Sequence, residues 1–193
     1  MYKIIALIGE AGSGKDRLLK EVLAAAPGQF NEIISCTTRP IREGEAEGVN
    51  YYYLTGKQFT DKVIAGQMLE TSGFNGWYYG TSYDSLSADK SNIGVFNPQG
   101  IRSLLKRHDI ELTVYRVRTS AKTRLLRQLN RENNPNVDEI IRRYTTDSID
   151  FENLEFTYIS LPNEEMNDLT LGVKKILCQH ETTGEQGQKK LND

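Results

Sequence analysis

The stretch Gly9-Glu10-Ala11-Gly12-Ser13-Gly14-Lys15-Asp16 begins where the first apolar run, residues 3–8, ends. It fits the pattern G-x-x-x-x-G-K, in which glycines let the backbone curl so that successive N–H groups point at one anion. A helical pattern follows directly over residues 15–26, and the positive end of such a helix also attracts an anion. This context disfavours the alternative of a glycine-rich turn that merely joins a strand to a helix. We therefore predict a strand, a phosphate loop and a helix, with Lys15 reaching the phosphates.

The same alternation of short apolar runs and longer helical stretches continues along the chain. Strands alternating with helices predict an α/β fold with three layers, in which helices cover both faces of a central parallel sheet. Asn97 can cap one helix and Pro98 can start it. The further strands are expected at residues 31–35, 93–96, 111–118 and 157–161, and the further helices after Ser120 and over residues 138–154 and 164–179.

The segment 37–83 has a different texture, with polar and aromatic residues in short runs at 50–54, 68–74 and 77–80. A capping box at Thr55 and Gln58 predicts one helix between the first two of these runs. We interpret this segment as an inserted subdomain. Residues 181–193 are polar and without periodicity, so burial cannot offset their ordering entropy, and we expect a disordered tail.

Length, charge and cysteine content limit the class of protein. A chain of 193 residues accommodates one domain of ordinary size. The formal net charge of -2 gives no general attraction for nucleic acid or anionic membranes, so we expect neither as a partner. Cys36 and Cys178 match no metal-ligand spacing and read as free thiols. Without a signal pattern or an apolar membrane span, the protein is expected in the cytoplasm.

A second anion site is indicated by Thr37-Thr38-Arg39-Pro40-Ile41-Arg42-Glu43-Gly44-Glu45. Two arginines three residues apart in a loop rich in Pro and Gly can present two planar, bidentate forks to one phosphate. Arg39 and Arg42 therefore suit a monophosphate. The alternative for an isolated R-x-x-R is a solvated basic turn.

Together with Leu69-Glu70 and Gly76-Trp77-Tyr78-Tyr79-Gly80-Thr81-Ser82, these motifs make residues 3–180 resemble the guanylate kinase family of P-loop nucleoside monophosphate kinases. The resemblance implies transfer of the γ-phosphate of ATP to GMP (or dGMP), with Mg²⁺, giving ADP and GDP (or dGDP). It also implies a domain over residues 1–180, in a protein that is a monomer or a homodimer. Its core would comprise 1–34, 84–123 and 144–180, its monophosphate-binding subdomain 35–83, and its lid 124–143.

The resemblance also assigns roles to single residues. Glu70 would accept hydrogen bonds from guanine N1–H and N2–H₂, a donor pair that adenine lacks. Lid arginines would close over the triphosphate and stabilise charge in transfer. The implied ATP-binding residues are Gly9, Glu10, Ala11, Gly12, Ser13, Gly14, Lys15 and Asp16. The implied GMP-binding residues are Ser35, Arg39, Arg42, Tyr51, Glu70, Tyr79, Thr81 and Asn97. The implied catalytic residues are Lys15, Arg127, Arg131 and Arg143.

Three positions depart from the family pattern. Asp16 stands where a Ser or Thr hydroxyl normally ligates magnesium, and Val95 and Asn97 replace the two acids of an Asp-x-Asp-x-x-Gly pattern. A carboxylate can hold a hydrated Mg²⁺, so we hypothesise that Asp16 is the metal ligand and compensates for Val95. Two alternatives stay open. One is a deoxynucleotide kinase with altered base specificity, and the other is a catalytically inactive guanylate kinase-like binding module.

Overall fold

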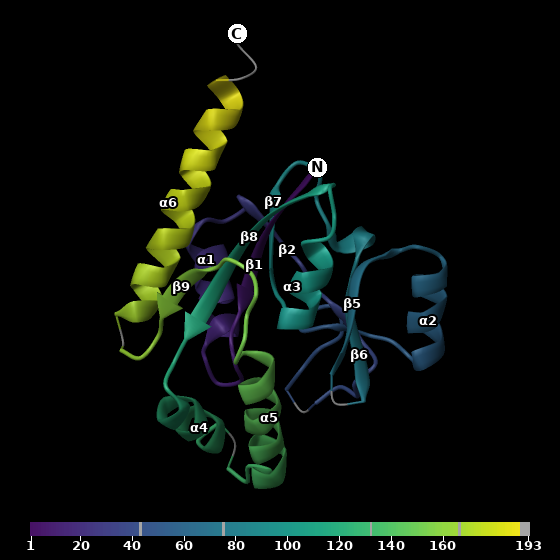
Figure 1. Ribbon diagram of the computed structural model, residues 1–193, viewed down its shortest axis with the longest axis vertical. Coiled ribbons are helices and arrows are strands. Elements are labelled where there is room, and N and C mark those ends of the chain that lie inside the picture. Colours follow the sequence, from purple (N-terminus) through teal and green to yellow (C-terminus); the bar gives the residue numbers. More distant parts are fainter. Residues whose placement is uncertain (43, 75, 132, 166, 190–193) are drawn as a thin grey trace. The chain divides into compact units, whose positions relative to one another are not determined.

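The computed structural model describes residues 1–42, 44–74, 76–131, 133–165 and 167–189 (Figure 1). Its contacts divide the chain into two compact units, each built from segments distant in sequence. The first unit comprises Met1–Ile8, Gln29–Val114 and Glu155–Thr157. The second unit comprises Gly9–Gly28, Tyr115–Leu154 and Tyr158–Asp193.

A parallel sheet has the strand order β2-β7-β1-β8-β9. In the first unit, β7 (Ser91–Val95) pairs in parallel with β1 (Tyr2–Ile8) and with β2 (Phe30–Glu32). The strand β8 (Ile110–Arg118) runs from the first unit into the second, where it pairs in parallel with β9 (Ile159–Pro162). The last five residues of β1 are all buried, which is the continuous apolar pattern of a strand covered on both faces. The predicted α/β fold with a central parallel sheet is confirmed.

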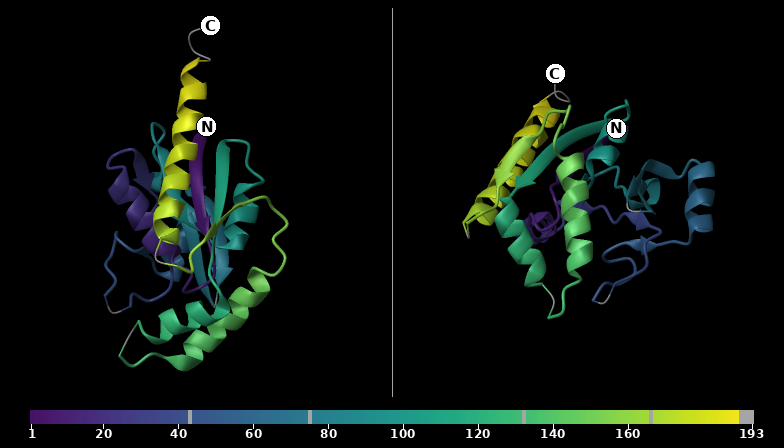
Figure 2. Two further views of the ribbon diagram at one scale, coloured as in Figure 1. Left: turned by 90° about the vertical axis from the view of Figure 1, so that its left-hand side faces the viewer. Right: turned by 60° about the horizontal axis from the view of Figure 1, so that its bottom comes forward.

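The second unit carries four helices along its described residues. The helix α1 (Lys15–Ala25) follows the phosphate loop and packs against α6 (Asp168–Lys189), which also packs against β9. Ser120 caps α4 (Ala121–Leu129), and Asn136 caps α5 (Val137–Asp150) through a hydrogen bond from Glu139 N–H. These two helices pack against each other, as Figure 2 shows from two further directions.

The backbone of α6 is helical through Lys189, whereas we expected that helix to end near residue 179 and disorder to begin at residue 181. Propagation of a helix adds one hydrogen bond for each residue fixed, so a helix that is already packed can extend into a polar segment. The predicted disorder of residues 190–193 lies outside the described residues.

The segment expected as an insertion forms a second sheet in the first unit, with strand order β4-β3-β6-β5. Its strands are β3 (Cys36–Thr37), β4 (Tyr52–Tyr53), β5 (Met68–Phe74) and β6 (Trp77–Ser82), followed by a 3₁₀ turn at Tyr83–Ser85. The predicted capping box at Thr55 and Gln58 begins α2 (Gly56–Ile64). Asn97 caps α3 (Pro98–Leu104), which packs against β5.

Within the described part of the chain, no helix combines the length and apolar composition needed to cross a membrane.

Candidate active site

The phosphate loop, residues 9–16, has a backbone that only glycine adopts readily at two positions. Gly12 has φ +81° and Gly14 has φ +91°, both in the left-handed region. A Cβ at Gly12 would also lie 2.6 Å from the carbonyl oxygen of Arg124. The close approach of the backbone to α4 therefore fixes glycine at this position.

The carbonyl oxygens of the phosphate loop are held by hydrogen bonds from side chains of the second unit. The Ser13 carbonyl accepts hydrogen bonds from Asn163 Nδ2 at 2.7 Å, Thr119 Oγ1 at 3.0 Å and Arg127 Nη1 at 3.3 Å. Arg127 also donates to the carbonyls of Gly12, at 3.3 Å, and Asn163, at 2.9 Å. Binding of the carbonyl side by the protein suits a loop whose N–H groups hold an anion.

The contact of Arg127 with the carbonyls of the phosphate loop was not predicted from the sequence. We predicted Arg127 as a lid arginine over the triphosphate, and in the structure its guanidinium holds the loop itself. Thr119 and Asn163 follow β8 and β9, and nothing in their local sequence indicates a contact with Ser13. The sequence signal is only that polar residues end two neighbouring parallel strands.

Gly12→Ala is expected to weaken ADP binding by about tenfold or more, because the added Cβ would push the loop away from α4. Gly28→Ala is the matched control, since Gly28 has φ +76° but no atom within 4 Å of an added Cβ. The positive φ alone should cost each variant about 1–2 kcal/mol of stability, and the contact with the Arg124 carbonyl should cost Gly12→Ala more. Isothermal titration calorimetry with ADP separates them, and equal affinities in the two variants would contradict a role for this close approach.

Lys15 and Asp16 occupy the first turn of α1. The Lys15 Nζ lies 3.8 Å from Asp16 Oδ2, and their side chains are 18% and 76% exposed, respectively. The Asp16 carboxylate also lies favourably at the positive end of the helix. Among the described side chains, no group of three or more His, Cys, Asp or Glu could hold a metal ion. One exposed carboxylate beside the loop fits Mg²⁺, which keeps several waters and takes one or two carboxylates together with phosphates.

A carboxylate of α5 contacts the phosphate loop. Asp147 Oδ2 accepts a hydrogen bond of 2.6 Å from Ala11 N–H, and Asp147 is 8% exposed. Burial raises the pKa of Asp147, against the opposing effects of the Ala11 N–H bond and of the charges of Lys15 and Arg124. Sequence reasoning missed Asp147, since it lies 136 residues from Ala11 and belongs to no motif.

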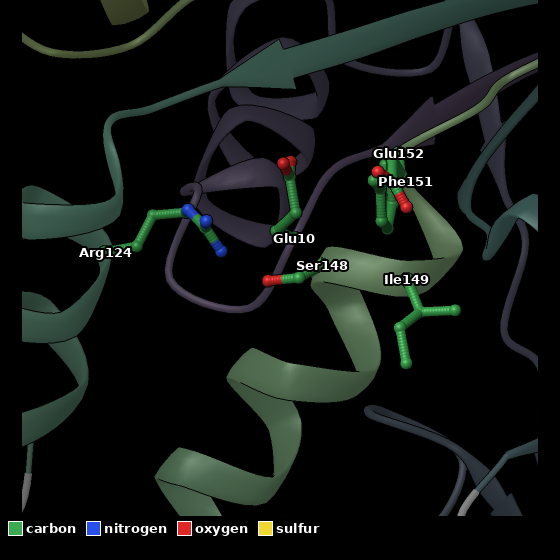
Figure 3. Close-up of a pocket in the computed structure, with 6 residues that line it drawn as sticks. All are labelled: Glu10, Arg124, Ser148, Ile149, Phe151 and Glu152. Atoms are coloured by element: carbon green, nitrogen blue, oxygen red, sulfur yellow. The ribbon is translucent and has the colours of Figure 1, made fainter.

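Further charges surround the same part of the loop. Glu10 Oε1 lies 3.1 Å from Arg116 Nη2, and the Arg116 guanidinium lies over the rings of Phe151 and Tyr158. Arg124 is 6% exposed and lies over the Tyr144 ring. A cavity of about 400 Å³ opens here (Figure 3). It is lined by Glu10, Arg124, Ser148, Ile149, Phe151 and Glu152.

The other predicted lid arginines have different surroundings. Arg143 Nε donates to Glu139 Oε1 at 2.7 Å, and Arg142 binds the same carboxylate. These are i,i+4 and i,i+3 pairs within α5, which exposed helices commonly form. Arg131 is exposed just beyond the end of α4. Their predicted contact with a triphosphate stays a prediction.

In the first unit, Arg39 is buried in a cage of acidic and aromatic groups. Its Nη2 lies 2.9 Å from both carboxylate oxygens of Glu45, and its Nη1 donates to the Pro40 carbonyl at 2.7 Å. Its guanidinium lies over the rings of Tyr51 and Tyr53, at 5.4 and 5.8 Å. Burial and the hydrogen bond to Glu45 raise the pKa of Tyr53 to about 12. Sequence reasoning predicted Arg39 but not its partners Glu45 and Tyr53.

The other predicted monophosphate residues lie on the same sheet or loop. The ring of Tyr79 packs edge-on against that of Tyr51, with 5.9 Å between centroids. The backbone N–H of Arg42 donates to Glu45 Oε2 at 2.9 Å, and the Arg42 side chain is exposed. Ser35 precedes β3, where its carbonyl accepts from Tyr52 N–H. The structure thus brings Arg39, Tyr51 and Tyr79 together.

Glu70 is a buried acceptor on β5. Thr81 Oγ1 donates to Glu70 Oε1 at 2.9 Å from the neighbouring strand β6. Burial raises the pKa of Glu70 to about 7, although the hydrogen bonds from Thr81 favour the ionised form. A Cβ at Gly100 would lie 3.0 Å from Glu70 Oε2 and 3.3 Å from Asn97 Oδ1. The predicted residues Glu70, Thr81 and Asn97 therefore converge at the start of α3.

Asn97 has both ends of its amide engaged by the protein. Its Oδ1 accepts from Gly100 N–H at 2.7 Å, which caps α3, and its Nδ2 donates to Ser72 Oγ at 2.8 Å. Ser72 is buried and was not predicted as a site residue. Val95, the other changed position, ends β7 and offers no ligand atom.

The comparisons with known proteins agree with these motifs. The guanylate kinase family model matches residues 1–180. Guanylate kinases of Streptococcus mutans and Streptococcus pyogenes are 39% and 38% identical to this chain over 95 residues. That stretch covers 48% of this chain, and 45% and 44% of the two relatives, so the match spans less than half of their length.

A solved guanylate kinase from Anaplasma phagocytophilum has the same fold, with a TM-score of 0.66 and 17% identity. This similarity covers 94% of the chain and 86% of that structure. The match of the family model over most of the chain is the decisive comparison, because it includes both the phosphate loop and the second sheet. The chain belongs to the guanylate kinase family.

Proposed function

We propose that this protein transfers the γ-phosphate of ATP to GMP (or dGMP), giving ADP and GDP (or dGDP). The observation that carries the proposal is the buried acceptor Glu70, which Thr81 holds at the start of α3. An ionised carboxylate only accepts hydrogen bonds, so it matches the N1–H and N2–H₂ donors of guanine and is left unpaired by adenine. The names of the relatives support the same reaction.

The acceptor's phosphate is assigned to Arg39, Arg42, Tyr51 and Tyr79. Arg39 is already oriented by Glu45 and by stacking on Tyr51, so little side-chain entropy is lost when a phosphate arrives. A phosphate oxygen of the bound monophosphate would attack the γ-phosphorus directly, and no covalent enzyme intermediate is needed. The protein's contribution is to position the two nucleotides and to exclude water.

The donor's phosphates are assigned to the phosphate loop. The braces from Asn163, Thr119 and Arg127 hold its carbonyls, while Lys15 supplies a cation for charge that develops during transfer. Arg127, Arg131 and Arg143 are proposed to close over the same triphosphate. When bound, Mg²⁺ would neutralise charge on the phosphates, and Asp16 is the carboxylate that would hold it through water.

The reaction is tested by measuring ADP release with ATP and a panel of nucleoside and deoxynucleoside monophosphates. GMP or dGMP should give the highest kcat/KM, and Lys15→Ala should serve as the inactive reference. Preference for AMP or a pyrimidine nucleotide would refute the assignment of Glu70. Binding of GMP without any turnover would leave a binding module as the better description.

Asp16→Ser is expected to raise the Mg²⁺ concentration needed for half-maximal turnover by several-fold, because a hydroxyl replaces an anionic ligand. The measurement is a magnesium titration at fixed ATP and GMP. Glu21→Ser is the matched control, since Glu21 is an exposed acid in the same helix but lies beyond its first turn. Superimposable titration curves for wild type and Asp16→Ser would show that Asp16 does not hold the metal.

A further inference from the structure

One backbone N–H of the phosphate loop is already bound by a carboxyl group of the same chain. The Ala11 N–H donates to Asp147 Oδ2 at 2.6 Å, a short bond of the kind that a charged acceptor forms. A phosphate loop binds its ligand through backbone N–H groups, and each N–H has one hydrogen to donate. A phosphate oxygen and the Asp147 carboxylate therefore compete for the Ala11 N–H.

A second partner for Asp147 lies in the same unit. Arg124 is 6% exposed, and its Nε and Nη1 are buried without a hydrogen-bond partner among the described residues. Buried guanidinium N–H groups without an acceptor are unfavourable, so a carboxylate that reached Nε or Nη1 would stabilise Arg124. Its positive charge already acts on Asp147, together with Lys15 and against Glu10.

The cavity beside Arg124 is lined from both α4 and α5, the helix that carries Asp147. Arg124 lines it from α4, and Ser148, the residue after Asp147, lines it from α5. Figure 3 shows the Arg124 guanidinium directed toward the space between Glu10 and Ser148. Space that a side chain could enter by a change of rotamer therefore lies beside both helices.

We propose that Asp147 is a positioning residue with two alternative partners. It holds the Ala11 N–H in the structure described here, and it moves to the Arg124 guanidinium when a nucleotide phosphate takes that N–H. The inference rests on the proposed function only in its choice of a nucleotide as the ligand. Because Asp147 belongs to α5, occupancy of the loop is coupled to the helix that also carries Arg142 and Arg143.

The test is a double-mutant cycle on ADP affinity, measured by isothermal titration calorimetry in one buffer. Asp147→Asn keeps an oxygen acceptor for Ala11 N–H but removes the charge, and it should bind ADP about tenfold more tightly than wild type. Arg124→Gln should weaken ADP binding by about tenfold, because the displaced Asp147 then has no partner. In the Asp147→Asn background, Arg124→Gln should change affinity less than twofold.

Glu152→Gln is the matched control, since it removes one exposed negative charge that lines the same cavity. Its ADP affinity should stay within twofold of wild type. Thermal unfolding of every variant establishes that each is folded. A purely structural role for Asp147 would lower the unfolding midpoint of Asp147→Asn without tightening ADP binding.

Two results would overturn the inference. One is ADP binding by folded Asp147→Asn that is equal to or weaker than that of wild type. Absence of ADP binding in both proteins counts as this result. The other is the same loss from Arg124→Gln in both backgrounds, which would mean that Arg124 acts on the nucleotide directly. If the protein binds ADP but does not phosphorylate GMP, the proposed function is refuted. The double-mutant cycle on ADP affinity would still decide whether Asp147 has two alternative partners.

Discussion

Replacing Glu70 with Gln is expected to lower kcat/KM for GMP by about 10³-fold, while the KM for ATP changes less than threefold. The amide that replaces the carboxylate has one acceptor and one donor, so one guanine N–H would face the N–H of the substituted amide in a buried position. Buried donors without acceptors cost far more than the loss of an exposed hydrogen bond. Steady-state kinetics with GMP and AMP at saturating ATP provide the measurement.

The control for Glu70→Gln is Asp61→Asn, an exposed acid of α2 that pairs with Lys57 at the surface. It removes one charge from the same unit without touching the buried acceptor, so its kinetics should match wild type. Retention of GMP turnover within tenfold in Glu70→Gln would mean that Glu70 does not read the base. Thermal unfolding must show that the variant is folded, because Glu70 also binds Thr81.

The pKa of Glu70 gives the same residue a pH signature. Burial raises this pKa from its ordinary value of 4.5 to about 7, so the free protein carries a proton on Glu70 below that pH. Guanine requires the ionised form, and kcat/KM for GMP should therefore fall about tenfold for each pH unit below 7. Glu70→Gln should abolish this fall of kcat/KM with decreasing pH.

Stability should vary with pH in the opposite direction to catalysis. Between pH 4.5 and 7 the folded protein binds the Glu70 proton more tightly than the unfolded chain does. The contribution of Glu70 is therefore most favourable below pH 4.5, and it is lost as the pH rises through 7. The shift thus marks Glu70 as a residue that costs stability in the range where it would bind guanine.

The elements that the sequence predicted well obey local rules. The capping box at Thr55 and Gln58 and the Asn97 cap are satisfied within a few residues, so their patterns can be read directly from the sequence. The glycines of the phosphate loop follow the same logic, because positive φ angles at Gly12 and Gly14 restrict the residue type whatever surrounds them.

The contacts that escaped prediction join residues far apart in the sequence or decide between competing partners. Asn163 lies 150 residues from Ser13, and Asp147 lies 136 residues from Ala11, so no periodicity connects them. The Arg39 loop contains its own acceptor, Glu45. The sequence does not show whether the Arg39 guanidinium binds that carboxylate or a phosphate. Packing decides such choices, and packing is a property of the whole fold.

Replacing Lys15 with Ala is expected to reduce turnover by about 10³-fold or more, because it removes the cation assigned to charge on the transferring phosphoryl group. Its pairing with Asp16, at 3.8 Å and with Asp16 mostly exposed, contributes little to stability, so the protein should still unfold at nearly the wild-type temperature. The same weakness leaves the Lys15 side chain free to turn toward a phosphate. ADP release with saturating GMP provides the measurement.

Lys20→Ala is the matched control, since Lys20 is an exposed lysine of the same helix, further from the phosphate loop. It removes an equal charge and side chain, and its turnover should stay within twofold of wild type. Turnover by Lys15→Ala within tenfold of wild type would show that transfer does not depend on this lysine. A loss of ADP affinity alone, with kcat unchanged at saturation, would assign Lys15 to binding of the ground state and remove it from the transition state.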